Sequence, residues 1–351
     1  MKANRGKPMS FSRAAIIGLF VGFASVAFCD PFTYTYTTIA DPNASYGTYA
    51  TGVNDSGQVV GYYGDANGTT QGFLYANGTF TTISDPNATA GTFVTGINDS
   101  GQLVGYYTAV TSTPIPNGVS ETAVNYGFVY ANGAYTTIDN PNSSTYGTWL
   151  DGINNSGQIL GYYQDASFVN YGFVDTNGAF TTISDPNALS GPFIYHGPLD
   201  GTFVNGLNDS GQIVGYYYLA DGKIQGIEYT KAGFTNLNGP DGGEVFPTGI
   251  NDSGEIVGTD DAGAFADING NYTTIADSNA GSGEIFPTGV NNSGDVVGYY
   301  DEGGVIYGVV ATPIPMPDGD PSPLLMIPAL IIVLMLARTW QKRCTRALPA
   351  S

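Results

Sequence analysis

The sequence predicts an all-β protein, a six-bladed β-propeller of four-stranded antiparallel blades that is closed by its N-terminal strand. Three observations lead to this prediction. Glycine and tyrosine are abundant, with 50 and 25 residues among 351, and only 11% of residues are charged. A tetrapeptide, Asn-Asp/Asn-Ser-Gly, recurs six times. The first and last strands of the repeat region are circularly shifted, so that one completes the other.

The composition disfavours helices. Long amphipathic helices need Ala, Leu, Glu and Lys, which are scarce here, whereas glycine-rich sequences with many tyrosines and threonines are typical of short strands joined by tight turns. The length suffices for one large β domain.

The tetrapeptide sets the period of the repeat. Its first residues are Asn54, Asn98, Asn154, Asn208, Asn251 and Asn291. The separations of 44, 56, 54, 43 and 40 residues average about 47, which fits a four-stranded propeller blade better than an ankyrin or leucine-rich repeat.

Each repeat contains four predicted strands. In the second repeat they are Phe93–Asn98, Gln102–Tyr107, Tyr126–Tyr130 and Ala134–Ile138. The last two are joined by Asn-Gly, the strongest short hairpin signal. An Asx-Pro pair then interrupts the strand pattern, because proline cannot donate to a ladder, and the next unit begins.

The ends of the array distinguish a ring from an open solenoid. The body opens with Thr33–Ile39, a strand of the fourth type, and closes with Tyr307–Val310, a strand of the third type. Pairing the two would complete the sixth blade and remove both sheet edges. The alternative, a β-solenoid, gains nothing from this shift and would need caps. We therefore expect the propeller to span residues 30–312.

Both termini carry predicted targeting segments. Residues 1–29 read as a signal peptide, in which a basic stretch precedes the apolar segment Ala14–Phe28, with cleavage after Ala27 or Cys29. Near the other end, a proline-rich spacer (313–323) leads into a hydrophobic sorting or anchor segment with a basic tail (324–351). Positive charge beyond the apolar stretch favours a cytoplasmic tail.

Two resemblances agree with export. The spacer, apolar stretch and basic tail resemble the PEP-CTERM sorting signal of exported bacterial proteins, although Pro315-Met316-Pro317-Asp318 replaces Pro-Glu-Pro. This resemblance implies processing by signal peptidase and an exosortase. It also implies an inner-membrane anchor before release to the cell surface or extracellular matrix.

The tetrapeptide and the Gly-Tyr-Tyr that follows it resemble the HAF family of extracellular repeats over residues 32–310. Gly258-Thr259-Asp260 replaces Gly-Tyr-Tyr in the fifth repeat. The resemblance implies secretion and a propeller-like array, and it implies no defined activity.

The charge distribution excludes several partners. All 30 acidic residues and only two basic ones, Lys223 and Lys231, lie between Asp30 and Asp320, which gives this region a net charge of −28 and no arginine. Nucleic-acid binding through phosphates is therefore excluded, as is an arginine clamp on an anion. Cations and neutral ligands remain compatible with this surface.

Aromatic residues supply the candidate ligand-binding ring. One stands five residues before each tetrapeptide: Tyr49, Phe93, Trp149, Phe203, Phe246 and Phe286. If the first strands surround the axis, these rings are candidates for stacking on a sugar, and packing between neighbouring blades is the alternative. The two tyrosines of each Gly-Tyr-Tyr must point to opposite faces of their strand.

A calcium site is the one metal or cofactor prediction. Asp260, Asp261 and Asp267 form the densest acidic cluster and are the candidate ligands. The aspartates of the tetrapeptides and of the Asp-Pro turns are also compatible with calcium, although Asx-turn chemistry is the preferred explanation for them.

Catalysis has little support in the sequence. His196, in an inserted loop, is the single histidine, so that a metal site built from several histidines is ruled out. The sequence also contains no nucleophile elbow. We expect a non-enzymatic surface or matrix protein that binds extracellular polysaccharide or partner proteins. A propeller enzyme that cleaves polysaccharide is the alternative, because the many acidic residues could supply the carboxylate pair that such hydrolysis uses.

Overall fold

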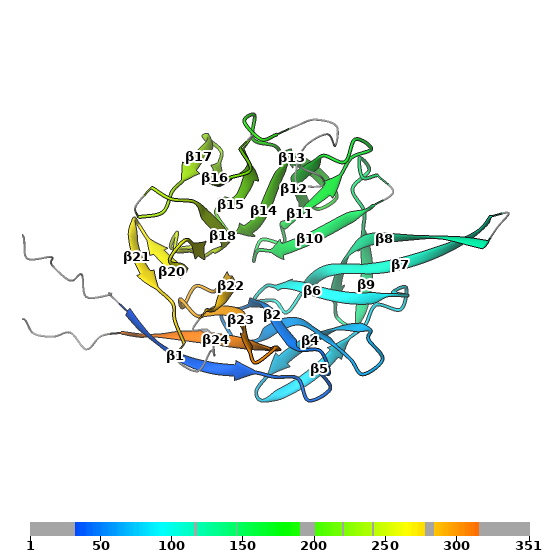
Figure 1. Cartoon of the computed structure of the whole chain (residues 1–351), viewed down its shortest axis with the longest axis horizontal. Helices are drawn as coiled ribbons and strands as arrows, with labels where there is room; N and C mark the ends of the chain where they lie inside the picture. Colours follow the sequence, from blue (N-terminus) through cyan, green and yellow to red (C-terminus); the bar gives the residue numbers. More distant parts are fainter. Residues whose placement is uncertain are drawn as a thin grey trace, which may run out of the picture.

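The computed structural model describes residues 32–315, except 116–117, 145, 190–200, 220, 241 and 278–283. These residues form 24 strands arranged as six four-stranded blades around a central axis (Figure 1), and one parallel pair, Thr70 with Gly91, joins blades 1 and 2 into a single sheet. The predicted six-bladed propeller is confirmed.

The blades follow one another along the chain. Blade 1 contains β2 (Thr48–Val53), β3 (Val59–Gly64), β4 (Thr70–Ala76) and β5 (Thr79–Ile83). Blade 2 contains β6 (Gly91–Ile97), β7 (Leu103–Ile115), β8 (Gly118–Ala131) and β9 (Ala134–Ile138). Blade 3 contains β10 (Thr148–Ile153), β11 (Ile159–Gln164), β12 (Asn170–Thr176) and β13 (Ala179–Ile183).

The second half repeats the pattern. Blade 4 contains β14 (Thr202–Leu207), β15 (Ile213–Tyr218), β16 (Ile224–Thr230) and β17 (Gly233–Leu237). Blade 5 contains β18 (Val245–Ile250), β19 (Ile256–Asp260), β20 (Gly263–Ile268) and β21 (Asn271–Thr274). Blade 6 contains β22 (Phe286–Val290), β23 (Val296–Glu302) and β24 (Val305–Pro315), with β1 (Phe32–Ile39) as its outer strand.

The N-terminal strand closes the ring as predicted. β1 pairs with β24 in antiparallel register over its whole length, from Phe32 opposite Pro315 to Ile39 opposite Gly308. The two ends of the described chain therefore lie side by side (Figure 1). β24 continues to Pro315, three residues into the segment predicted as a spacer.

The hydrophobic core consists of six clusters, each between two neighbouring blades, in the described part of the chain. Val104 of blade 2, for example, packs with Leu150 and Phe173 of blade 3. The last interface is closed in the same way, because Ile39 and Val297 of blade 6 pack with Phe73 of blade 1. Since each blade buries its faces only against its neighbours, the fold depends on closure of the ring.

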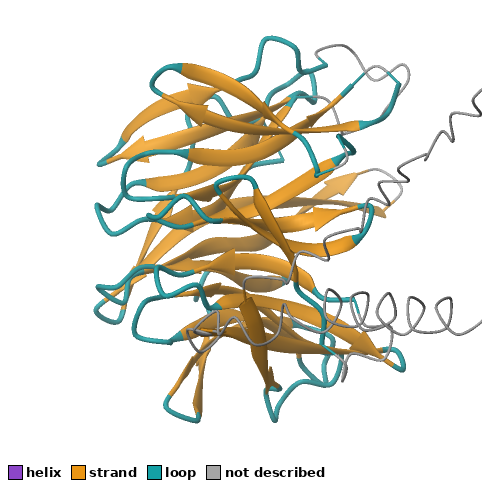
Figure 2. Cartoon of the chain, turned by 90° about the vertical axis from the view of Figure 1, so that its left-hand side faces the viewer, coloured by secondary structure: helices purple, strands orange, loops and turns teal. Residues whose placement is uncertain are grey.

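All elements of the described chain are strands, joined by loops (Figure 2). Accordingly, this part of the chain holds no helix with the length and hydropathy to cross a bilayer. The predicted signal peptide (1–29), the anchor segment (324–351) and His196 lie outside the described residues.

Candidate functional site

The first strand of each blade lines the central axis, as the sequence suggested. A Cβ atom added to Gly52 would lie 3.2 Å from the Cα atom of Gly96, and one added to Gly96 would lie 3.1 Å from that of Gly152. Similar approaches link Gly206 to Gly249 at 2.9 Å and Gly249 to Gly289 at 3.0 Å. Glycine therefore permits six backbones to crowd around one narrow channel.

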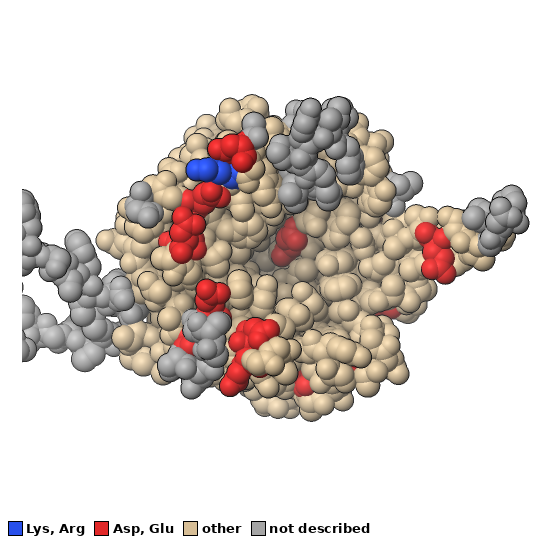
Figure 3. All heavy atoms as spheres, in the orientation of Figure 1, with Lys and Arg blue, Asp and Glu red and all other residues tan. Residues whose placement is uncertain are grey.

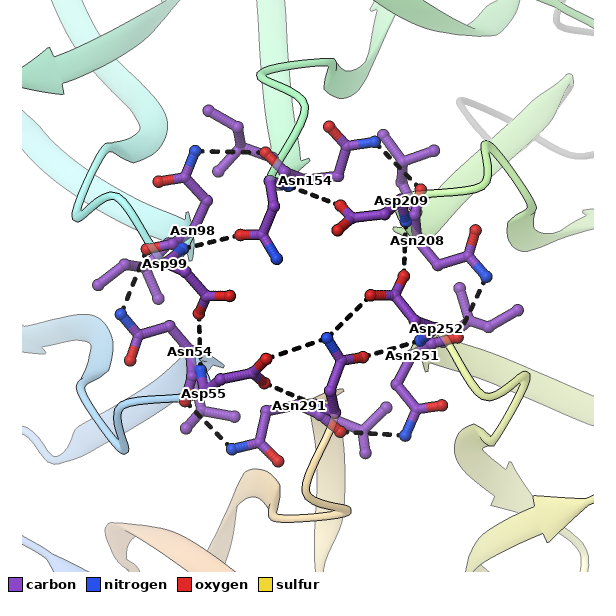
Figure 4. A pocket seen from close by; sticks show the side chains of 18 residues that line it. Asn54, Asp55, Asn98, Asp99, Asn154, Asn208, Asp209, Asn251, Asp252 and Asn291 are labelled. Atoms are coloured by element: carbon purple, nitrogen blue, oxygen red, sulfur yellow. Dashed lines mark hydrogen bonds between the residues drawn. The ribbon is translucent and has the colours of Figure 1, made fainter.

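One end of the channel is a ring of asparagines that joins each blade to the next (Figure 4). The Asn54 side chain makes an Asx-turn, since its Oδ1 accepts the backbone N–H groups of Ser56 and Gln58. Its Nδ2 donates to the backbone carbonyl of Asn98 in the next blade, at 3.2 Å. Equivalent bonds continue around the ring and end with Asn291 donating to the carbonyl of Asn54.

The residue after each of these asparagines forms a second circle of bonds. The backbone N–H of Asp55 donates to Oδ1 of Asp99, and the pattern repeats until the N–H of Asn292 donates to Oδ1 of Asp55. Asn292 also bridges two carboxylates, because its Nδ2 donates to Asp55 and Asp252. The carboxylates of these aspartates thus bond a neighbouring blade, whereas the Asx-turn that the sequence offered as the alternative explanation is made by the preceding asparagine.

The next part of the channel along the axis, which we call the neck, is a cavity of about 90 Å³. In the first strand of each blade, one residue of the neck lies at a β-bulge: its two neighbours pair with the second strand, but it does not. The bulge turns its side chain out of the regular alternation. The six neck residues are Thr51, Thr95, Asp151, Asn205, Thr248 and Thr288.

The neck residues are held by donating to backbone carbonyls. The hydroxyl of Thr51 donates to Val94 of the next blade at 2.9 Å, and that of Thr95 donates to Leu150 at 2.8 Å. Thr288 reaches Ala50, and Asn205 uses its Nδ2 to reach Pro247. In each case the acceptor is the residue just before the neck residue of the following blade.

Asp151 breaks this pattern, because an ionised carboxylate has no proton to donate to Val204. The side chain keeps part of its surface accessible to the channel, while its Oδ2 atom is buried without a hydrogen-bond partner. Desolvation by burial raises the pKa of Asp151 to about 8. Figure 3 shows acidic atoms deep in the central hollow of the molecule.

The six aromatics that were predicted to bind a ligand are not among the residues that line the neck. Tyr49 stacks on Tyr62 of its own blade, with ring centroids 4.9 Å apart, and meets Tyr299 of blade 6 edge-on. Phe93, Phe203 and Phe246 likewise contact a tyrosine of the preceding blade. Packing between blades, the alternative explanation, therefore describes four of the six.

Trp149 and Phe286 differ, because each stacks on a tyrosine of its own blade, and Phe286 is 41% exposed.

The two tyrosines of each Gly-Tyr-Tyr do face opposite ways. The second one is buried, as at Tyr63 and Tyr107, whereas the first joins the aromatic belt just described. Burial, the largest cause, raises the pKa of Tyr106, Tyr162 and Tyr216, and the negative charge of Asp151 raises it further. The belt tyrosines therefore lie within electrostatic range of the neck.

A second cavity, of about 630 Å³, opens between blades 2 and 3. Tyr126 and Val124 of β8 form one wall, and Asp139, Tyr146, Asp165 and Phe168 line the rest with neighbouring small residues. Tyr146 is 44% exposed, and its ring centroid lies 5.2 Å from that of Phe168. We call this cavity the blade 2–3 cleft.

Phe168 occupies a backbone conformation that disfavours it. Its φ is +66°, whereas the same turn in blades 1 and 4 carries glycine, Gly68 and Gly222, at +79° and +84°. The turn itself is unchanged, because the N–H groups of Phe168 and Gly68 both donate to the carbonyl of the aspartate three residues earlier. A bulky residue in the left-handed region costs about 1–2 kcal/mol, so the aromatic ring is placed at the expense of local stability.

The predicted calcium ligands are not brought together. Asp260 and Asp267 lie near opposite ends of the β19–β20 pairing, opposite Gly263 and Ile256 respectively. Each accepts the backbone N–H of its own turn, from Ala262 and Gly270, while Asp261 is exposed in the β19–β20 turn. Within the described residues, no three His, Cys, Asp or Glu side chains are grouped so as to hold a metal ion.

The sequence analysis missed Asp151, Tyr146 and Phe168, although a signal for the first and last was present. Aligning the repeats places Asp151 where four other repeats have threonine and Phe168 where two others have glycine. A departure from a repeated structural residue marks a position where the repeated fold alone does not explain the side chain.

Comparison with known proteins leaves the function open. No protein-family model matches the chain, and no curated protein is similar to it. Among solved structures, it is similar to a fucose-recognising six-bladed propeller lectin of Aleuria aurantia, with 15% identity, coverage of 83% of this chain and 99% of that one, and a TM-score of 0.40.

Two further structures are similar at the same level. AofleA from Arthrobotrys oligospora has 12% identity, with coverage of 81% and 94% and a TM-score of 0.35. Trypanosoma rangeli sialidase has 11% identity, with coverage of 90% of this chain and 61% of that one and a TM-score of 0.39. At these scores no function is transferred, and the fold assignment depends on the strand pairing itself.

Proposed function

We propose that this chain is an exported bacterial surface or matrix protein that binds extracellular polysaccharide in the blade 2–3 cleft without cleaving it. The observation that carries the proposal is the Tyr146–Phe168 pair, whose second member is held at a φ of +66°. Strained residues are retained where a function depends on them. An aromatic face packs against the apolar C–H face of a sugar ring.

The polar residues of the cleft suit sugar hydroxyl groups. Asp139 Oδ1 accepts the hydroxyl hydrogens of Ser143 and Thr148, at 3.1 and 2.9 Å. Asp165 also lines the cleft, from the turn that carries Phe168. With two acidic residues and no lysine or arginine among the lining residues, the cleft favours neutral or amine-bearing polysaccharide over anionic polymers.

The first prediction concerns this cleft. Tyr146→Ala and Phe168→Gly should each weaken binding to a neutral glycan by about tenfold, the equivalent of about 1.4 kcal/mol of lost stacking. Phe168→Gly should leave the melting temperature within a few degrees of wild type, because relief of backbone strain offsets the lost ring contact. Binding of full-length protein to a glycan array, followed by titration of the best ligand, measures both effects.

The matched control is Tyr46→Ala. Tyr46 is the equivalent exposed tyrosine of blade 1, but the turn beneath it carries Gly68 in place of an aromatic partner. Its removal should leave binding unchanged, and an equal loss there would place the site elsewhere.

Polysaccharide cleavage is the second candidate function, because Asp139 and Asp165 line one cleft. An assay for new reducing ends on a bound polymer tests this candidate. If wild type releases them and Asp165→Asn does not, the chain is an enzyme and not only a binding protein.

We further infer that the termini direct location. The support is sequence alone: a signal peptide at 1–29, and a PEP-CTERM-like segment at 324–351 beside repeats that resemble the HAF family. Removing 324–351 should release the protein from the inner-membrane fraction into the periplasm or medium. Fractionation of cells that express each form tests this, and identical distributions would contradict the anchor.

A further inference from the structure

The neck of the channel presents hydrogen-bond acceptors to the axis. A hydroxyl group has one hydrogen, and the hydrogens of Thr51, Thr95 and Thr288 are directed to backbone carbonyls. Thr248 likewise donates to Val257 of its own blade. The four hydroxyl groups therefore have only lone pairs left to offer to a ligand in the channel.

The two remaining neck residues extend this set of acceptors. Asn205 donates its Nδ2 to Pro247 at 2.7 Å, so that its Oδ1 is the side-chain oxygen left for the channel. Asp151 supplies a carboxylate whose Oδ2 is buried and unpartnered. The neck thus combines five neutral oxygen atoms that could ligate a cation with one negatively charged carboxylate. All six residues occupy the bulged position of equivalent strands.

We propose that the neck is an axial binding site for a single monovalent inorganic cation, with Asp151 as its charged ligand. Buried charges are stable when they are paired or coordinate a metal ion. The two lysines of the described chain lie in the β15–β16 and β16–β17 turns of blade 4, away from the first strands, so that neither pairs with Asp151. Rings of neutral oxygens that replace a hydration shell are the chemistry by which proteins bind sodium and potassium.

Size and charge select the class of ion. A neck of about 90 Å³ is large enough for an ion with one or two waters, and it is too small for a sugar. One carboxylate neutralises one positive charge, whereas calcium sites use several carboxylates. The neck shares no lining residue with the blade 2–3 cleft, so its test is independent of the test of the proposed function.

The test compares cations at constant ionic strength and at pH 9, where Asp151 with its pKa of about 8 is ionised, using full-length protein in sodium, potassium or N-methyl-D-glucamine salts. Sodium or potassium should raise the melting temperature saturably, by about 5 °C at a hundredfold excess over Kd. N-methyl-D-glucamine, which is too bulky for the neck, should not. An equal response to all three would mean diffuse screening of the acidic surface, and would overturn the proposal.

Asp151→Thr is the decisive variant, because it installs the residue that four other blades carry. It should fold, regain a hydroxyl bond to Val204, and melt at a higher temperature than wild type in N-methyl-D-glucamine. It should also lose the sodium or potassium increment. Asp151→Asn, which removes only the charge, should lose the increment as well.

Two results would contradict the site. A sodium or potassium increment that persists in both variants would place the ion elsewhere. A saturable effect of calcium alone, at sub-millimolar concentration, would show that the neck does not select a monovalent ion. Anomalous scattering from rubidium or thallium(I) on the axis of crystals would locate the bound ion directly.

Discussion

Deletion of β1 (residues 32–39) is expected to abolish cooperative folding, because it opens the ring. The strand supplies the whole outer edge of blade 6, and Ile39, only 2% exposed, belongs to the core between blades 6 and 1. Tyr34 and Tyr36 pack against the core between blades 5 and 6. Its loss uncovers the edge of β24 and two cores together, which favours aggregation. Thermal melts and size-exclusion chromatography measure the outcome.

The matched control removes a longer segment that does not close the ring. β7 and β8 extend beyond the other strands as a projecting hairpin (Figure 1). Excising residues 110–123 and joining Ala109 to Val124, which are paired, through Asn-Gly should keep the melting temperature within a few degrees. If the β1 deletion melts like this control and like wild type, the ring is not the source of stability.

Gly105→Ala should be among the most damaging single methyl additions in the blades. A Cβ atom on Gly105 would lie 2.0 Å from the backbone oxygen of Phe93, on the paired strand, and neither backbone can yield without breaking the ladder. A Cβ atom added to any other Gly-Tyr-Tyr glycine, or to Gly258 of blade 5, would lie 1.9–2.3 Å from the equivalent backbone oxygen of its own blade. We expect a loss of about 3–5 kcal/mol, and a fall of about 10 °C or more in melting temperature.

Gly152→Ala is its control. Gly152 has no atom within 4 Å of an added Cβ and no left-handed φ, so alanine there should be neutral or slightly stabilising. Denaturant titration of both variants gives the difference in unfolding free energy. Similar losses at the two positions would show that the effect is generic to glycine removal and not due to the contact with Phe93.

The alignment of repeats was enough to predict the ring because each feature it used is local or periodic. The Asn-Asp/Asn-Ser-Gly turns, the Asn-Gly hairpins and the alternation within strands are decided by residues close in sequence. The circular shift of Thr33–Ile39 relative to Tyr307–Val310 then left one pairing that removes both edges. Even the crowding of Gly52 and its equivalents followed from their recurrence beside the axis.

The candidate sites were predicted less well, because they depend on which neighbours a side chain meets. The six aromatics recur like the fold itself, and all of them pack against a tyrosine ring, four of them across a boundary between blades. Asp260 and Asp267 are close in sequence, but antiparallel pairing separates them along a hairpin. Proximity in sequence is a poor guide to proximity around a metal when the chain is extended.

The sequence by itself determined the strand content, the six-fold repetition, the closing strand and the acidic, arginine-free surface. Only the tertiary structure decided what the exceptions to the repeat do. A bulge turns Asp151 into a neck where its equivalents donate to carbonyls, and a left-handed turn sets Phe168 against Tyr146, in the segment that leads into the same blade. The first outcome depends on strands from all six blades, whose mutual contacts become defined only when the ring closes, and the second depends on the folding of one blade.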